Sequence, residues 1–102
     1  MTLGVPRETA PDERRVALTP DAIRRLARAE VEVVVERGAG ATAFVSDAAM
    51  EAAGARLGDR TEALGADVVA TVKGLPPEDV AQVREGAVVL ASKSDGRGWG
   101  RF

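Results

Sequence analysis

Four short apolar runs, separated by stretches with helical signals, constrain the fold of this chain more than any other feature. The runs cover residues 2–5, 31–35, 68–72 and 87–91, and each of them contains valine. Each run is too short for a helix and suits a strand that is buried on both faces. Strands that alternate with helices form right-handed βαβ units. We therefore expect an α/β fold, with a parallel sheet of about four strands and flanking helices.

The segments between the runs carry specific signals for helix ends. Thr19 can cap a first helix that has Pro20 in its first position, and the spacing of Ile23 and Leu26 carries this helix to about Glu30. Shorter helical segments are expected at 46–54, 59–65 and 76–86, and a minor strand at 55–57. Each of these helical segments begins with a capping residue or a proline and ends at a glycine.

The length of the chain has room for one domain. Its 102 residues suffice for a modest core, but not for a core and a separate cofactor domain. We assign residues 1–92 to the α/β domain and residues 93–102 to an irregular, glycine-rich tail without hydrophobic periodicity. The break in the pattern after Ser92 suggests that the domain is incomplete, through truncation or a frame shift.

The composition excludes several classes of function. The formal net charge is −2, and no cluster of Lys and Arg offers the surface that a nucleic acid needs. The chain has no cysteine and no histidine, so zinc sites with those ligands and acid/base catalysis by histidine are excluded within it. We therefore expect no nucleic acid and no metal as a partner. No apolar run approaches the roughly 20 residues of a membrane span, which predicts a cytoplasmic protein.

A cationic loop before the first helix is the strongest candidate for a binding site. Arg15 lies in this loop, and Lys73 directly follows the third apolar run. Parallel α/β folds bind ligands at the carboxyl ends of their strands, where a guanidinium and an ammonium could clamp a carboxylate or a phosphate. The alternative is that both are solvated surface charges, with Glu8 and Glu13 as partners of Arg15. Spacing alone favours this alternative, and no residue is assigned a catalytic role.

A glycine-rich stretch at 38–43 has two interpretations. Gly38, Gly40 and Ala43 match the G-x-G-x-x-A spacing of a dinucleotide fingerprint that follows a strand. However, the next helix cap is Ser46, and no strand ends in an acidic residue about 20 residues later. We interpret the stretch as a plain turn, and the cofactor-binding residues stay unassigned.

Several ordered motifs carry a resemblance to a known family. They are GVPRET at 4–9, ERRVALTP at 13–20, VVERGAG at 34–40 and AAGA at 52–55, and the chain fits the family over about residues 2–92. It resembles the N-terminal domain shared by alanine dehydrogenases and the alpha subunit of NAD(P) transhydrogenase. The resemblance implies a flavodoxin-like or formate-dehydrogenase-like α/β domain. In full-length members it implies a further Rossmann domain that binds NAD(H) across a cleft. In the alanine dehydrogenase branch it implies that Arg15 and Lys73 hold the substrate carboxylate.

The two branches of this family differ in a histidine. Alanine dehydrogenases carry one shortly after the strand that matches residues 87–91, where it acts as an acid/base in hydride transfer. This chain has Ser92-Lys93-Ser94 there. It therefore looks closer to the transhydrogenase alpha subunit, which takes part in hydride transfer between nicotinamide nucleotides in a proton-translocating enzyme. This resemblance implies membrane-embedded transhydrogenase subunits as partners and a position peripheral to the inner membrane.

Two other functions stay open. The chain could be a fragment of an alanine or related amino-acid dehydrogenase, or a non-catalytic module for small-anion binding or association. Because hydride transfer needs the Rossmann domain, we do not expect this chain to be catalytic alone. The exposed edges of a short sheet predict a homodimer.

Overall fold

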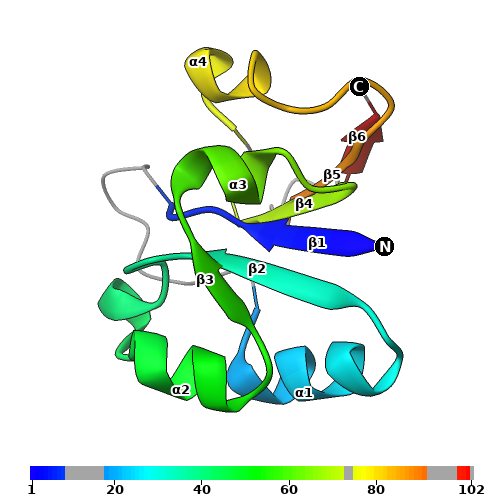
Figure 1. Cartoon of the computed structure of the whole chain (residues 1–102). Coiled ribbons are helices and arrows are strands. Elements are labelled where there is room, and N and C mark those ends of the chain that lie inside the picture. The colour runs from blue at the N-terminus through cyan, green and yellow to red at the C-terminus, as the bar shows by residue number, and fades with distance from the viewer. Residues whose placement is uncertain (9–17, 73–74, 92–98, 102) are drawn as a thin grey trace.

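The computed structural model, which describes residues 1–8, 18–72, 75–91 and 99–101, has one sheet of six strands. The strands are β1 Thr2–Val5, β2 Glu32–Glu36, β3 Arg56–Gly58, β4 Val68–Thr71, β5 Val88–Ala91 and β6 Trp99–Arg101. Their order across the sheet is β3-β2-β1-β4-β5-β6 (Figure 1). The strands β1 to β5 run parallel, and β6 pairs with β5 in the antiparallel direction. The predicted α/β fold is confirmed, with five parallel strands because the minor strand joins the sheet as β3.

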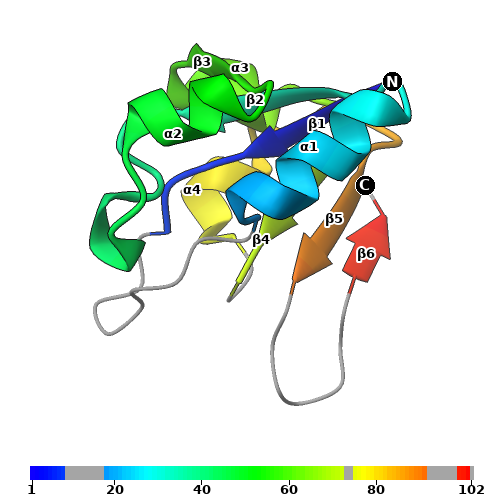
Figure 2. The ribbon, with the colours of Figure 1, turned by 90° about the horizontal axis from the view of Figure 1, so that it is seen from below.

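Helices cover both faces of the sheet. They are α1 Pro20–Arg28, α2 Asp47–Ala52, α3 Arg60–Leu64 and α4 Pro77–Val80, with a 3-10 helix at Ala41–Ala43. The helices α1 and α2 lie on one face, while α3 and α4 lie on the other (Figures 1 and 2). No helix within the described residues has the length and apolar character needed to cross a membrane.

The helix starts follow the capping signals of the sequence. Thr19 Oγ1 accepts a hydrogen bond from the Ala22 N–H at 3.3 Å, and Ser46 Oγ accepts one from Ala49 at 3.1 Å. The cap of α3 is a reciprocal capping box, in which Asp59 and Glu62 each bond the other's backbone N–H. The C-terminal ends of the helices follow the sequence signals less regularly. The helix α4 spans only four residues, and the chain beyond it continues in turns with i→i+3 hydrogen bonds.

The core is divided by the sheet into two layers. The larger layer lies against α1 and α2 and contains Leu3, Val5, Ile23, Val33, Val35, Ala39, Met50, Ala53, Ala55 and Ala70. The smaller layer contains Leu64, Val69 and Val89. Alternation along the strands explains this division, since Val69 and its neighbour Ala70 in β4 belong to different layers.

The tail contains a strand where the sequence predicts irregular structure. In β6, Trp99 pairs with Leu90 and Arg101 with Val88. Without β6, the side of β5 that faces away from β4 would be an edge of the sheet, and its backbone N–H and C=O groups would have no partner in the sheet. The strand β6 supplies these partners. Composition alone does not reveal such pairing, because it is a contact with a distant strand. Residues 92–98 lie outside the described residues, and a domain boundary at residue 92 stays a prediction.

Asp67 ties the amino ends of β1 and β4 together. Its Oδ2 accepts hydrogen bonds from the Thr2 backbone N–H at 2.9 Å and the Thr2 hydroxyl at 3.2 Å, and its own N–H donates to Thr2 Oγ1 at 3.1 Å. Arg84 forms an ion pair with the same carboxylate at 2.5 Å. The backbone hydrogen bond from Thr2 is the main cause that lowers the pKa of Asp67, and the hydroxyl and the charge of Arg84 lower it further.

This lowered pKa predicts a loss of stability in acid. A carboxyl whose pKa is lower in the folded state stabilises the fold above its ordinary pKa, and that contribution is lost as the pH falls through the lowered value. We expect the free energy of unfolding of the wild type to fall from about pH 4 downward. In Asp67→Asn this slope should be shallower, since residue 67 no longer titrates. Urea unfolding at a series of pH values measures both slopes, and identical slopes would contradict the role of Asp67.

Candidate functional site

The candidate site lies where the chain changes from one face of the sheet to the other. The strands β1 and β4 are parallel neighbours, with Leu3 opposite Val68 and Gly4 opposite Val69. The chain after β1 goes to α1 on one face, whereas the chain after β4 goes to α4 on the opposite face (Figure 1). Connections that diverge in this way leave a crevice at the carboxyl ends of the strands, where open α/β sheets bind their ligands.

The two cationic residues predicted for this site follow these two strands. Arg15 belongs to the segment 9–17 after β1 and Lys73 to the segment 73–74 after β4, and both segments lie outside the described residues. Their immediate neighbours are described. Glu8 accepts a hydrogen bond from the Val72 backbone N–H at 2.9 Å. The two segments therefore leave the sheet from points that are joined to each other.

Arg60, the first residue of α3, is the centre of a charged cluster at the same edge. Its Nε donates to Asp79 Oδ1 at 3.0 Å, and its Nη2 forms an ion pair with Asp79 Oδ2. Asp79 lies in α4, and only 6% of its side chain is exposed. This bidentate pair joins the two helices that cover one face of the sheet, and a pair of this geometry is stronger than a single charged hydrogen bond.

The same guanidinium reaches the ends of two strands. Arg60 Nη1 donates to Glu36 Oε1 at 2.8 Å and to the backbone oxygen of Arg7 at 3.0 Å. Glu36 is the last residue of β2, and its Oε1 also accepts the Arg7 N–H at 2.7 Å. The backbone just after β1 is therefore hydrogen-bonded through both the N–H and the C=O of Arg7.

The charges of this cluster do not cancel. Two carboxylates, Asp79 and Glu36, share one guanidinium, and the hydrogen bonds that Arg60 donates to Asp79 are the main cause that raises the pKa of Arg60. Asp79 and Glu36 together carry one more negative charge than the guanidinium of Arg60 that they share. Within the described part of the chain, no group of three His, Cys, Asp or Glu side chains is placed to hold a metal ion.

The sequence prediction missed the Arg60 cluster. Asp59 and Glu62 were recognisable as a helix start, and Glu36 as a charged end of a strand. The first residue of a helix that directly follows a parallel strand lies at the carboxyl edge of the sheet, and this rule could have pointed to Arg60. Its partner Asp79 could not be identified, because nothing local to either residue relates them.

The glycine-rich stretch forms a turn, as the sequence predicts. The turn passes into the 3-10 helix, and α2 begins only at Asp47. A Cβ on Gly40 would come within 2.6 Å of the Val45 backbone oxygen and 2.9 Å of Met50 Cε. Packing within the turn therefore explains why residue 40 is a glycine.

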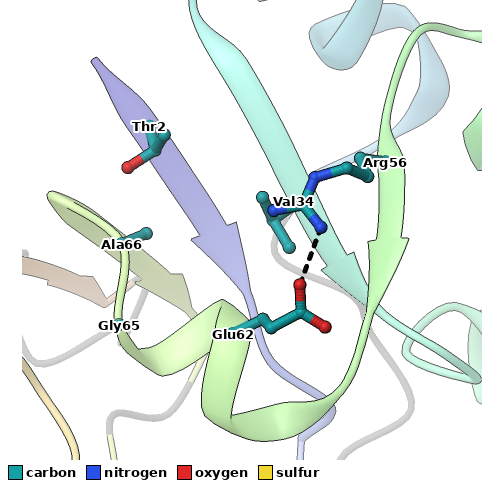
Figure 3. Close-up of a pocket in the computed structure, with 6 residues that line it drawn as sticks. All are labelled: Thr2, Val34, Arg56, Glu62, Gly65 and Ala66. Carbon is teal, nitrogen blue, oxygen red and sulfur yellow. Dashed lines mark hydrogen bonds and ion pairs between the residues drawn. The ribbon is translucent and has the colours of Figure 1, made fainter.

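A pocket lies at the other end of the sheet, beneath the end of α3. It has a volume of about 310 Å³ and is lined by Thr2, Val34, Arg56, Glu62, Gly65 and Ala66 (Figure 3). Arg56 is the cation in its wall, but it bonds Glu62 at 2.7 Å and Glu32 at 3.1 Å. These partners raise the pKa of Arg56, and Arg56 in turn lowers the pKa of Glu62. A guanidinium held by two carboxylates is a weak anion site, so the carboxyl edge remains the candidate.

These features define a doubly wound α/β domain with a topological switch point between β1 and β4, the place where domains of this class bind ligands. Residues 4–93 match the family described as alanine dehydrogenase/PNT, N-terminal domain, and the chain belongs to this family.

Relatives come from both branches of the family. The chain is 36% identical over 91 residues to the NAD(P) transhydrogenase subunit alpha of Haemophilus influenzae, which covers 89% of this chain and 18% of that protein. It is 38% identical over 91 residues to the alanine dehydrogenase of Bacillus subtilis, covering 88% and 24%. The crystal structure of transhydrogenase from Sinorhizobium meliloti superposes with a TM-score of 0.86 at 35% identity, covering 89% and 27%. The chain thus spans about a quarter or less of the length of these relatives.

Proposed function

We propose that this chain is the N-terminal domain of the NAD(H)-binding component of a proton-translocating NAD(P) transhydrogenase. Sequence identity does not distinguish the two branches, because the chain is 36% identical to a transhydrogenase subunit and 38% identical to an alanine dehydrogenase. The observation that carries the choice is the Ser92-Lys93-Ser94 sequence after β5, in a chain without histidine. Hydride transfer between two nicotinamides needs no protein acid/base at that position, whereas reduction of an imine does.

In this role the domain forms one wall of the NAD(H) cleft. Its carboxyl edge faces a Rossmann domain that binds the cofactor, and the membrane-embedded transhydrogenase subunits are its partners. The sheet ends in β3 on one side, and among the described residues no further strand pairs with this edge, which could therefore pair with a second copy. A homodimer is therefore part of the proposal, and sedimentation equilibrium of the chain checks it.

Two chimeras, in which this domain replaces that of a transhydrogenase subunit or of an alanine dehydrogenase, test to which branch of the family the chain belongs. We expect a chimera with the rest of the Haemophilus influenzae transhydrogenase subunit to support NADPH-dependent reduction of an NAD analogue when combined with its membrane subunits. The same exchange into the Bacillus subtilis alanine dehydrogenase should give no alanine-dependent NADH formation, because the histidine is missing. Circular dichroism and sedimentation establish that both chimeras fold.

The control for this experiment restores a histidine to the second chimera. Separate Ser92→His, Lys93→His and Ser94→His variants place it at each position of the segment. Alanine-dependent activity in one of these variants, with none in the parent, would show that the histidine is what distinguishes the branches. Activity of the unmodified alanine dehydrogenase chimera, with an inactive transhydrogenase chimera, would reverse the proposal.

We also propose that Arg15 and Lys73 form a small-anion site on this wall. The support is topological, since each follows one of the two strands that flank the switch point, and Glu8 and Val72 join the two exits. A guanidinium fork and an ammonium on adjacent loops can hold both oxygens of a carboxylate. The alternative amino-acid dehydrogenase function would use the same pair for its substrate.

Titration with pyruvate tests the pair. We expect saturable binding by the wild type, and a Kd raised about tenfold to a hundredfold in Arg15→Ala or Lys73→Ala, because each loses charge-assisted hydrogen bonds. Isothermal titration calorimetry measures both. Arg28→Ala, at the exposed end of α1, is the matched control and should bind as the wild type does. Absence of saturable binding by the wild type would rule out the site for this class of ligand.

A further inference from the structure

We propose that two copies of this chain pair through their β3 strands, in a symmetric antiparallel contact centred on Leu57 in which Arg56 of each copy binds Glu62 of the other. The inference rests on the homodimer of the proposed function and names its contact. The strand β3 forms one edge of the sheet, and β6 forms the other (Figure 1). A two-fold dimer needs a patch that is complementary to itself, and β3 offers one through its backbone and its charges.

The backbone of β3 directs one residue, Leu57, to the open side of the sheet. The Arg37 N–H donates to the Gly58 backbone oxygen at 3.1 Å, so Gly58 directs its backbone groups toward β2. Backbone groups alternate in direction along a strand, and Leu57 therefore directs its N–H and C=O away from β2. The next residues that point this way, Ala55 and Asp59, already donate their N–H groups within the chain. An antiparallel partner can thus exchange a pair of hydrogen bonds with Leu57.

A two-fold axis at Leu57 brings Arg56 of each copy opposite Gly58 of the other. Arg56 points to the face that α3 covers, because it bonds Glu62, and Gly58 lies two residues further along the same face. Residues opposite each other next to a hydrogen-bonded pair have Cα atoms about 4.5 Å apart. A contact centred on Arg56 would instead place two like charges opposite each other, which is unfavourable. Charge therefore favours the register centred on Leu57.

The carboxylate of Glu62 lies over Gly58, where the arginine of a second copy would arrive. A Cβ on Gly58 would come within 3.1 Å of Glu62 Oε1 and 3.2 Å of Val34 Cγ1. Figure 3 shows Arg56 and Glu62 directed toward each other from β3 and α3. Arg56 uses Nε for Glu32 and Nη1 for Glu62, and within the described part of the chain no acceptor bonds its Nη2. This Nη2 can bind the partner's Glu62, which gives two ion pairs across the axis.

The charges around the contact balance within each copy. Arg56 binds two carboxylates, Glu32 and Glu62, and Arg37 lies close enough for its charge to act on Glu62 as well. Two copies therefore approach each other without a net repulsion at this edge. The side chains of Arg56 and Glu62 are 53% and 43% exposed, so salt should weaken the pairs between the copies. Because the contact is short, we expect a weak dimer.

The experiment measures the dimer Kd of the 102-residue chain by sedimentation equilibrium, at concentrations up to about 1 mM. The variants are Arg56→Glu, Glu62→Gln and the charge exchange Arg56→Glu/Glu62→Arg. Glu62→Gln keeps the capping box, because a glutamine can take the same position in it. Arg25→Glu, at an exposed position of α1, is the matched control. Circular dichroism establishes that each variant is folded, and NMR follows amide exchange.

We expect Arg56→Glu to raise the dimer Kd at least about tenfold, because it places like charges together at both ends of the contact. Glu62→Gln should raise the Kd about threefold, and the charge exchange should return it to within about threefold of the wild type. Exchange of the Leu57 amide should slow as the concentration of the chain rises, while that of Val35 in β2 should not change. Arg25→Glu should dimerise as the wild type does.

Failure of the homodimer and failure of this contact give different results. A wild type that stays monomeric at about 1 mM overturns the homodimer and the contact, while the transhydrogenase function is decided by the chimeras. If the wild type dimerises, an unchanged Kd in Arg56→Glu or a concentration-independent exchange at Leu57 overturns the β3 contact and leaves the homodimer unaffected. An Arg25→Glu variant that dimerises as weakly as Arg56→Glu would show that net charge controls association, and would also overturn the contact.

Discussion

Replacement of Gly4 by alanine should lower the free energy of unfolding by about 3 kcal/mol or more, a large part of the stability of a small domain. A Cβ at this position would overlap the backbone oxygen of Ala63 and come within 2.7 Å of its carbonyl carbon. Ala63 lies in α3, which packs directly on β1 and β2. Because the obstacle is backbone, no side-chain rotation can relieve it, and the strand or the helix must move.

Gly38→Ala is the matched control for this prediction. Gly38 has a φ of +83°, and nothing lies within 4 Å of its would-be Cβ. Its replacement therefore measures backbone strain without overlap, at a cost of about 1–2 kcal/mol. Urea unfolding followed by circular dichroism gives both free energies. A loss at Gly4 no larger than the loss at Gly38 would contradict the close approach of α3 to β1.

The second large effect is expected for Ile23→Ala, at about 2–5 kcal/mol. Ile23 is completely buried and is the one buried residue of α1. Loss of three methyl or methylene groups leaves a cavity between α1 and the sheet. The neighbours Val33 and Val35 both lie in β2, which is paired with β1 and β3 and cannot move to close the cavity.

The control for Ile23 lies on the same helix. Arg25 is exposed, and Arg25→Ala should change the free energy of unfolding by about 0.5 kcal/mol or less. The same urea experiment measures both variants. Since α1 starts directly after the loop that carries Arg15, the Ile23 variant should also weaken pyruvate binding at temperatures where the domain is still folded. Equal stability of the two variants would show that α1 is not anchored through Ile23.

Most of the local structure could be predicted from particular residues. Thr19, Ser46 and Asp59 accept the hydrogen bonds expected of helix caps. The helix predicted at 76–86 is the main overestimate, because its proline start has no side-chain cap and α4 ends at Val80. The extra strand at the tail could not be predicted, since its stability comes from pairing with β5.

The candidate site was predictable only in part. Arg15 and Lys73 follow from the rule that parallel sheets bind ligands at the carboxyl ends of strands, together with the family motifs, and their roles stay predictions. The contacts of Arg60 with Asp79, Glu36 and Arg7 could not be derived. They depend on which loops the strand order brings together, and many strand orders satisfy the same alternation of strands and helices.

The sequence by itself determined the alternation of elements, the positions of the helix starts and the family of this chain. These depend on interactions within a few residues or on motifs read directly in order. Only the tertiary structure decided that β1 lies between β2 and β4 and that α3 packs too closely on Gly4 for a side chain there. It also decided that Arg60 joins three segments at the carboxyl edge. The physical reason is that packing of the whole sheet sets such distant contacts, which no local propensity encodes.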